Sequence, residues 1–309
     1  MSEQHHSDYS ALASMRIGIQ PTCWTNDDFP EIGDDRPYQE ILDETKEAGF
    51  VGGSLGHNYP THLPSLLHDL RSRHLGVSST WVGTEFTAPD RYEATLQFVR
   101  DQIRFLKKIG ATDIVVAELA SAVNQVRTKA VLTDRPLLTE PQWYLLTKGL
   151  NEAGSLAAEK QMRLAFHPHV GTGVQQAEET HRLLSETDPS CVWLCLDTGH
   201  TRFAGDDPSA VAREHAARIG HVHLKNVRQR VVDAATANKY SFYRAILDGV
   251  FTVPGDPDGD IDFAPIFEEL VRVNFSGWLV VEAEQDPTKA NPLKYARMAR
   301  EFIRETTGL

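Results

Sequence analysis

The chain has 309 residues, and its 43 acidic against 31 basic side chains give a formal net charge of −12, which disfavours binding to a nucleic-acid backbone or to an anionic membrane surface. A hydrophobic content of 41%, without an apolar stretch of about 20 residues, is typical of a soluble globular protein. Three irregularly spaced cysteines are too few for a disulfide framework, so we expect a cytoplasmic protein whose polar residues 1–14 form an N-terminal arm and not a secretion signal.

Short apolar runs rich in valine, isoleucine and leucine recur along the chain, and a longer segment with helical periodicity follows each of them. This alternation predicts parallel strands joined by helices. The predicted strands are 15–20, 50–55, 76–82, 113–118, 163–167, 192–197, 220–225 and 278–284. The predicted helices lie around 38–48, 61–74, 91–109, 140–160, 175–186, 207–218, 262–274 and 289–306. Eight such units without a linker favour one domain, a single (β/α)8 TIM barrel over residues 15–309, although open doubly wound sheets share the same alternation.

Two of the predicted strand-to-helix connections are unusually long. One covers residues 119–139 and the other covers residues 226–261, and neither shows an evident helix or strand of its own. Long connections of this kind are commonly lids or binding loops. We therefore expect both to contribute to a functional site.

Four strands in the second half of the chain end with a side chain of the kind that binds metal ions. They occur in the segments RLAFHPH, WLCLDTGH, GHVHLK and WLVVEAE, and the candidate ligands are His167, Asp197, His223 and Glu282. Barrel enzymes build their active sites at the C-terminal ends of the strands, so the four side chains are expected to meet there. Two imidazoles and two carboxylates suit Mn²⁺, Co²⁺, Fe²⁺ or Zn²⁺, and the sequence alone does not choose among these ions.

A plainer interpretation exists for each ligand taken singly. An aspartate at a strand end is commonly a helix cap, and a single histidine is commonly a hydrogen-bonded filler of the core. Four such residues at the same level of four strands favour a metal site. Side chains alternate along a strand, so Trp193, Cys195 and Asp197 share one face, which points to the barrel axis if the leucines between them face the helices.

Further polar and aromatic residues near strand ends are candidates for chemistry. His169 shares a face with His167, and Lys225 shares one with His223. His200 in DTGH either orients the substrate or Asp197 or caps the next helix, whereas Lys225 is either a proton donor or an ion-pair partner of a ligand carboxylate. Glu118 is either a base or a structural partner of an arginine. Two tryptophans, Trp24 and Trp81, follow strands and form either the apolar wall of a sugar site or part of the core.

The segments WTNDDFPEIG, FHPHVGTGVQ, LDTGH, HVHLKNVR, FTVPGD, GDIDF and VVEAEQDPTKANPL resemble those of the inosose dehydratases, which belong to the xylose-isomerase-like barrel superfamily. The resemblance spans most of residues 15–306. It implies a single barrel that binds Mn²⁺ or Co²⁺ and removes water from scyllo-inosose (2-keto-myo-inositol), giving a trihydroxycyclohexanedione in inositol catabolism. By position it implies that His167, Asp197, His223 and Glu282 bind the metal. Asn26 and Arg228, which lie in two of the matching segments, are candidates for substrate binding together with Trp24 and Trp81.

The first of these ligands also bears on the reaction. The superfamily usually has glutamate there, and its isomerases and epimerases use a pair of carboxylates to move a proton on carbon. With His167 in that place the pair is absent, which favours β-elimination by one base and one acid, with His169, Lys225 and Glu118 as candidates for the proton transfers. The chain departs from the family at GGSLG, where Ser54 replaces an expected glutamate.

Alternative functions are a sugar or sugar-phosphate isomerase or 3-epimerase on the same metal barrel, or an inactive barrel that senses sugars. A small polyol or keto-sugar is the expected partner in the first two. Barrels of this type commonly pair through long loops, so a homo-oligomer is expected as well.

Overall fold

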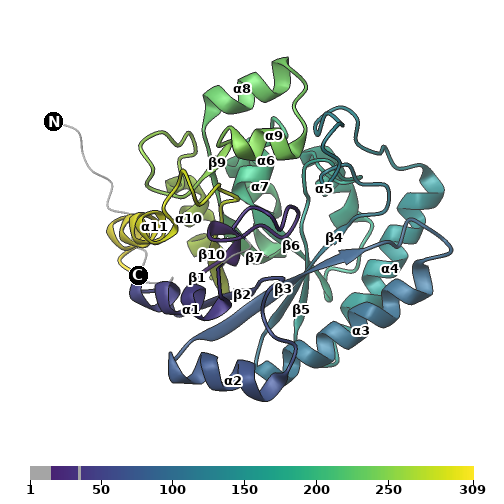
Figure 1. The fold of residues 1–309 in the computed structure, drawn as a ribbon. Coiled ribbons are helices and arrows are strands. Elements are labelled where there is room, and N and C mark those ends of the chain that lie inside the picture. Colours follow the sequence, from purple (N-terminus) through teal and green to yellow (C-terminus); the bar gives the residue numbers. More distant parts are fainter. Residues whose placement is uncertain (1–14, 34–35) are drawn as a thin grey trace.

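A computed structural model describes residues 15–33 and 36–309 of the chain, and the expected N-terminal arm, residues 1–14, lies outside them (Figure 1). Eight parallel strands close into a barrel in the order β1, β10, β7, β6, β5, β4, β3, β2. The predicted TIM barrel is therefore confirmed. The strands are β1 (Arg16–Ile19), β2 (Gly52–Leu55), β3 (Gly76–Thr84), β4 (Asp113–Glu118), β5 (Arg163–Phe166), β6 (Val192–Asp197), β7 (Ile219–Leu224) and β10 (Trp278–Val281).

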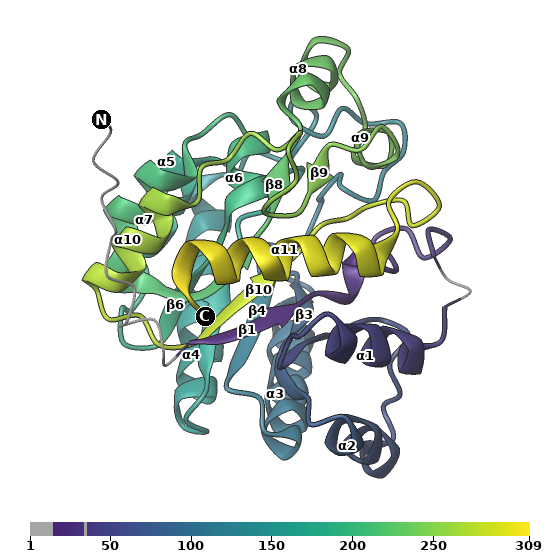
Figure 2. The same cartoon turned by 90° about the vertical axis from the view of Figure 1, so that its left-hand side faces the viewer.

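An outer ring of helices covers the barrel, as Figures 1 and 2 show from two sides. The helices are amphipathic and bury one face. In α3, for example, Leu96, Val99, Ile103 and Leu106 are buried at the three- and four-residue spacing of one helical face. The ring consists of α1 (Tyr38–Glu47), α2 (Leu63–Ser72), α3 (Tyr92–Ile109), α4 (Glu140–Ala158), α5 (Ala177–Ser185), α7 (Pro208–His215), α10 (Ala264–Arg272) and α11 (Pro292–Thr307). Short helical turns are η2 (Pro21–Cys23), α6 (Thr198–Phe203) and η3 (Ala216–Arg218).

The barrel interior is filled with side chains, and the candidate metal ligands lie toward its C-terminal end. A small apolar cluster packs Cys195 and Trp193 of β6 against Val115, Ala165 and Trp81 from β4, β5 and β3. This cluster confirms that the odd-numbered residues of β6 face inward. Asp197, the next in that series, therefore also points to the barrel axis.

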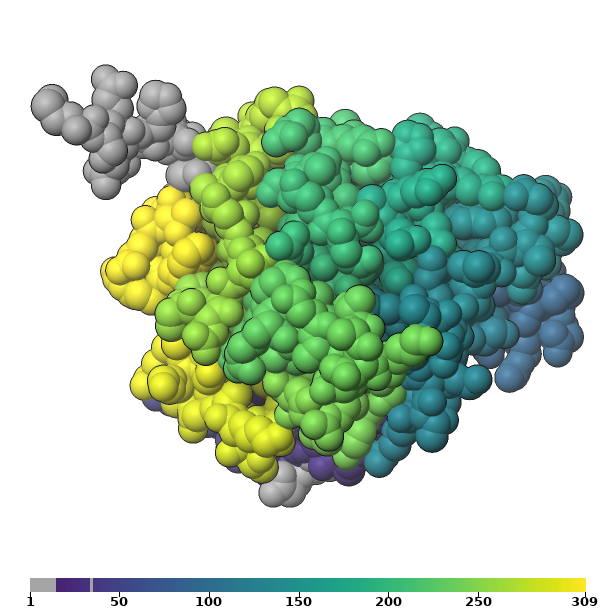
Figure 3. Space-filling model, turned by 90° about the horizontal axis from the view of Figure 1, so that it is seen from above, coloured from purple at the N-terminus to yellow at the C-terminus, as the bar shows by residue number. Residues whose placement is uncertain are grey.

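The connection after β7 contains secondary structure that the sequence did not reveal. It has two short antiparallel strands, β8 (Asn226–Val227) and β9 (Phe251–Thr252), and two helices, α8 (Gln229–Ala237) and α9 (Phe242–Leu247). These elements have two to nine residues each, too few for a hydrophobic period to stand out. Figure 3, which looks down on this end of the barrel, shows the green residues of the connection over the middle of the face.

The connection 119–139 has turns only and is held by its neighbours. Val123 N–H donates to the Gly171 carbonyl at 2.8 Å, and Val131 N–H donates to the Tyr240 carbonyl at 2.9 Å. The second bond ties it to the connection after β7, so two long loops meet over the C-terminal end of the barrel. Among the described residues, none of the helices has the length and apolar character needed to cross a membrane.

Candidate metal centre and active site

The structure brings the four predicted metal ligands together at the C-terminal end of the barrel. His167 follows β5, Asp197 ends β6, His223 lies in β7 and Glu282 follows β10. One potential ligand atom from each lies within 4.8 Å of the other three. All four side chains are buried. Parallel strands place them at one level, since Asp197 is the register partner of His223.

The contacts within this cluster fit a bound cation. His167 Nε2 lies 3.3 Å from Asp197 Oδ2, and His223 Nδ1 lies 3.5 Å from the same oxygen and closer still to Glu282 Oε2. Among the described residues, the buried His167 Nδ1 has no hydrogen-bond partner, and the contact between His223 Nδ1 and Glu282 Oε2 lacks hydrogen-bond geometry. Buried polar atoms are almost always paired, so atoms of this kind point to an ion or water that completes the site. Gln20 Nε2, 3.2 Å from His223 Nε2, holds the far side of that ring.

Lys225 lies beside the cluster and partly balances its charge. Its Nζ is 3.3 Å from Asp197 Oδ2, 3.1 Å from Glu282 Oε1 and 2.7 Å from Glu284 Oε2. Although burial by itself lowers the pKa of Lys225, these three carboxylates raise it above its usual value. With neutral imidazoles, three carboxylates against one ammonium leave an excess of two negative charges, which a divalent cation would neutralise.

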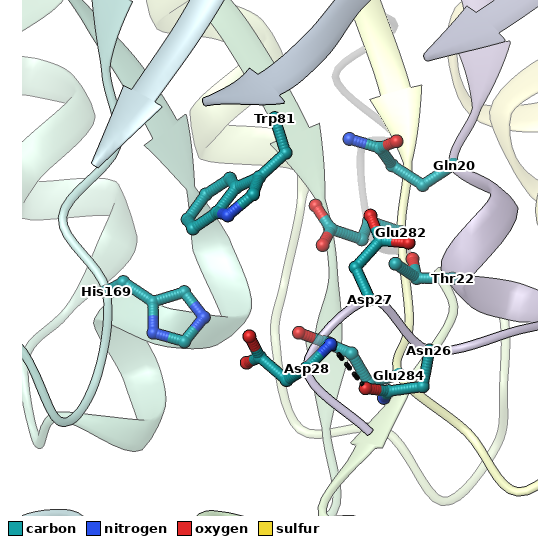
Figure 4. A pocket seen from close by; sticks show the side chains of 9 residues that line it. All are labelled: Gln20, Thr22, Asn26, Asp27, Asp28, Trp81, His169, Glu282 and Glu284. Atoms are coloured by element: carbon teal, nitrogen blue, oxygen red, sulfur yellow. Dashed lines mark hydrogen bonds between the residues drawn. The ribbon is translucent and has the colours of Figure 1, made fainter. Parts of the chain in front are cut away.

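A pocket opens next to the cluster. Of the residues singled out from the sequence, His169, Trp81, Asn26 and Glu282 line the pocket (Figure 4). The remaining lining residues are Gln20, Thr22, Asp27, Asp28 and Glu284.

Sequence reasoning missed the polar residues of the first connection. Asp27 and Asp28 lie in the segment WTNDDF beside the candidate Asn26, and two adjacent acidic residues after a strand are the signal that was available. Glu284, two residues after Glu282, is a further lining residue that was not singled out from the sequence. The residues after β1 and the residue after β10 both reach the pocket because these two strands are neighbours in the closed barrel.

Within the described part of the chain, His169 lines the pocket with one ring nitrogen that makes no hydrogen bond. Its Nδ1 donates to the Val170 carbonyl at 2.8 Å, which leaves Nε2 as the acceptor. Burial, together with the neighbouring His200 and His167, holds the pKa of His169 well below its usual value. His200 packs against it with ring centroids 3.8 Å apart and ring planes tilted by 37°, and His200 Nε2 lies 3.6 Å from Glu284 Oε1. His200 therefore supports His169 from outside the pocket lining.

The structure does not place Glu118 or Lys225 in the pocket. Glu118 Oε2 accepts hydrogen bonds from the Thr84 hydroxyl at 2.9 Å and from Phe86 N–H at 3.0 Å, while Oε1 accepts from Thr87 N–H at 3.1 Å and the Thr87 hydroxyl at 2.9 Å. All these bonds anchor the loop after β3, so the expectation that Glu118 is a base is corrected to a structural anchor. Lys225 is fully buried among its three carboxylates, which favours the ion-pair alternative over the proton donor.

Two of the candidates for substrate binding also lie elsewhere. Trp24 is fully buried and its indole N–H donates to Glu44 in α1, so it belongs to the core and not to a sugar-binding wall. Arg228 donates to the Gly249 and Phe251 carbonyls and pairs with Asp256 at 2.7 Å, so it stabilises the connection that contains the antiparallel pair β8 and β9. These two expectations are corrected accordingly.

Ser54, the departure from the family pattern, is buried inside the wall of the barrel. Its hydroxyl lies 3.0 Å from the Ser78 hydroxyl and 2.8 Å from the Ser79 hydroxyl, both in β3. Ser54 is not among the residues that line the pocket next to the metal cluster. A cluster of three small hydroxyl groups thus fills this position.

The barrel and its cluster of four candidate metal ligands together indicate a class of protein. The family model described as xylose isomerase-like TIM barrel matches residues 17–306, and the chain belongs to that family. Solved structures show the same fold. A D-allulose 3-epimerase from Methylomonas sp. matches with a TM-score of 0.69 and 16% identity over 95% of this chain and 97% of that one. The IOLI protein, solved with a bound zinc atom, matches with a TM-score of 0.70 and 14% identity over 95% and 98%.

Curated relatives narrow the class to one family. An inosose dehydratase from Geobacillus thermodenitrificans is 44% identical over 295 residues, which cover 96% of this chain and 98% of the relative. An inosose dehydratase from Clostridium tetani is 41% identical with the same coverage. The chain belongs to the inosose dehydratase family. The prediction of a dehydratase-type hydro-lyase on this barrel is confirmed at the level of the family.

Proposed function

We propose that this protein is a metal-dependent dehydratase that removes water from scyllo-inosose or a closely related cyclic keto-polyol in inositol catabolism. The observation that carries the proposal is the cluster of His167, Asp197, His223 and Glu282 beside a polar pocket, in a chain of the inosose dehydratase family. A polyol ring fits this pocket chemically, because carboxylates, an amide and a tryptophan face line it. The barrel, residues 15–309, would form one catalytic domain. Its cytoplasmic location and homo-oligomeric state stay predictions.

The four ligands fit a divalent ion with mixed nitrogen and oxygen donors. Mn²⁺ and Co²⁺ are the ions that the family resemblance implies, and the zinc in the IOLI protein supports Zn²⁺ as a third candidate. Fe²⁺ also suits the donor set. When bound, the ion supplies a Lewis acid that polarises the substrate ketone.

The residues of the chain would carry out the binding and the proton transfer. The Asn26 side-chain amide nitrogen is buried without a partner among the described residues and is available to a substrate hydroxyl. Trp81 offers its ring to the carbon face of the substrate, and His169 Nε2 accepts the proton from the carbon next to the ketone. Both rings come from neighbouring parts of the barrel, with centroids 5.5 Å apart.

The test replaces the ligand that contacts most of the cluster. In Asp197→Asn we expect loss of the stoichiometric metal, measured by inductively coupled plasma mass spectrometry, and loss of turnover with scyllo-inosose, followed by the ultraviolet absorbance of the diketone. Asp258→Asn, which removes an exposed carboxylate, is the matched control. An Asp197→Asn protein that keeps one metal ion per chain and full turnover would rule out the four-ligand site. Products isomeric with the substrate, formed without loss of water, would favour the isomerase or epimerase alternative.

A further inference from the structure

Asp28 is a pocket carboxyl group that the long connection 119–139 holds in place. It follows β1, and its backbone N–H donates to Asn26 Oδ1 at 3.0 Å. Its two carboxyl oxygens each accept one hydrogen bond from the connection 119–139, from Asn124 Nδ2 to Oδ2 and from Gln125 Nε2 to Oδ1, both at 3.0 Å. Carboxyl oxygens have further acceptor capacity beyond one bond each. The group is therefore fixed in orientation and still able to meet a ligand.

Asp28 and His169 both line the pocket, and Figure 4 shows the carboxyl group of Asp28 directed toward the His169 ring. A β-elimination needs an acid for the departing hydroxyl in addition to the base. The other carboxyl groups of the pocket are engaged. Glu282 is a metal ligand, Glu284 pairs with Lys225 at 2.7 Å, and Asp27 Oδ1 lies 2.8 Å from His57 Nδ1.

The surroundings of Asp28 also favour its neutral form more than those of an ordinary aspartate. Burial raises the pKa of Asp28 to about 6, against the lowering effect of its hydrogen bonds from Gln125 and Asn124 and with the help of the negative charges of Glu284 and Asp27. A catalytic acid works best when its pKa lies near the operating pH. An aspartate with its usual pKa would be almost wholly ionised there.

We propose that Asp28 is the catalytic acid of the dehydration and protonates the hydroxyl group that leaves, while His169 acts as the base. The inference rests on the proposed function. The C–H electron pair next to the ketone forms the new C=C bond, the C–O bond at the next carbon breaks, and the leaving oxygen takes the proton of Asp28 to depart as water. Asp28 ends as a carboxylate and His169 as an imidazolium, and proton exchange with solvent restores both.

The test separates cleavage of the C–H bond from loss of water. Metal-loaded enzyme is incubated with scyllo-inosose in deuterium oxide, and both diketone absorbance and deuterium incorporation next to the ketone are followed. In Asp28→Asn we expect water loss to fall by about 10²- to 10⁴-fold, the usual contribution of acid–base catalysis, while deuterium exchange continues within about tenfold of the C–H cleavage rate of the wild type. In His169→Gln both reactions should be lost.

Two further variants and the pH dependence of the reaction test the same proposal. Asp90→Asn, which removes an exposed carboxylate near α3, should behave as wild type, and Asp28→Glu should recover part of the water loss because it keeps a carboxyl group. Since the acid must be protonated, wild-type kcat/KM should decrease as pH rises past about 6, and this decrease should be absent in Asp28→Asn.

Three outcomes have distinct meanings. Full water loss by Asp28→Asn would contradict the proposal, and equal loss of exchange and dehydration would show that Asp28 only binds substrate, which also overturns it. Absence of both reactions in the wild-type enzyme would instead contradict the dehydratase function itself.

Discussion

At the scale of single residues, Asp197 combines a helix cap with the position of a candidate metal ligand in one side chain. Its Oδ1 accepts the His200 N–H at 2.7 Å and caps α6, while its Oδ2 faces His167, His223 and Lys225. The cap fixes the carboxyl group in the orientation that the cluster requires. From sequence, helix cap and metal ligand were alternative roles for this aspartate. The geometry is compatible with both roles, because one carboxylate oxygen caps the helix and the other faces the cluster.

Lys225 is expected to be more important for the stability of the metal-free protein than for proton transfer. Lys225→Met leaves three buried carboxylates without their ammonium, and loss of one partner of a buried ion pair costs about 3–5 kcal/mol. We expect that decrease in the free energy of unfolding, measured by urea denaturation in the presence of a chelator. Added Mn²⁺ should then stabilise the variant more than the wild type, because the cation takes over charge that Lys225 balances.

The comparison uses Lys107→Met, which removes an exposed lysine from the last turn of α3. If metal-free Lys225→Met is as stable as the wild type, the carboxylates around Lys225 are not held as charged groups.

At the scale of elements, three connections form a clasp over the pocket, made of residues 20–33, 119–139 and 226–261. Arg127 joins them, because its guanidinium pairs with Glu31 and lies 4.3 Å from the centroid of the Tyr243 ring. Phe29 packs edge-on against Tyr243 with centroids 4.9 Å apart. The loop that carries Asp28 is thus ordered by both long connections.

Arg127→Ala should weaken substrate binding with little effect on stability. The Arg127 side chain is exposed, and exposed ion pairs contribute at most about 1 kcal/mol. If the clasp is less ordered in the free protein, substrate binding must order it, and the free-energy cost of this ordering lowers the affinity for the substrate. We expect KM to rise by up to about fivefold, which corresponds to about 1 kcal/mol, with a smaller change in kcat, from steady-state kinetics with scyllo-inosose.

Arg304→Ala, which removes an exposed arginine with an ion pair on α11, is the control. An unchanged KM in Arg127→Ala would show that the clasp stays ordered without this residue.

The elements also show why the sequence predicted one part of the site and not another. His167, Asp197 and His223 could be found because each lies at the end of an apolar run whose alternation fixes the inward face. From sequence, Trp81 and Trp24 were equal candidates for a sugar-binding wall. In the structure β3 extends to Thr84, so Trp81 lies within the strand and faces the barrel interior, whereas Trp24 follows η2 outside the barrel strands. Asp28 depends on Asn124 and Gln125, 96 and 97 residues away, which periodicity does not relate to it.

At the scale of the whole molecule, closure of the barrel completes the site. β1 pairs with β10 from Arg16 beside Trp278 to Ile19 beside Val281, and Gln20 N–H donates to the Val281 carbonyl at 2.8 Å. This seam joins the two ends of the chain and brings Gln20 next to His223 and Glu282. The proposed ligands from β5 to β10 therefore meet only in the folded barrel, so metal binding at this site would be coupled to global folding.

This coupling predicts that metal removal lowers the thermal stability of the entire barrel. An ion that binds only the folded state at 100 times its Kd adds about 2.7 kcal/mol to the free energy of unfolding. For a chain of this size that corresponds to a rise in Tm of about 5 °C. Calorimetry should show this rise when Mn²⁺ is added to chelator-treated wild type, and no rise in Asp197→Asn. The same Tm with and without metal in the wild type would mean that the cluster holds no ion in the folded state, since a folded-state ligand must stabilise the fold that binds it.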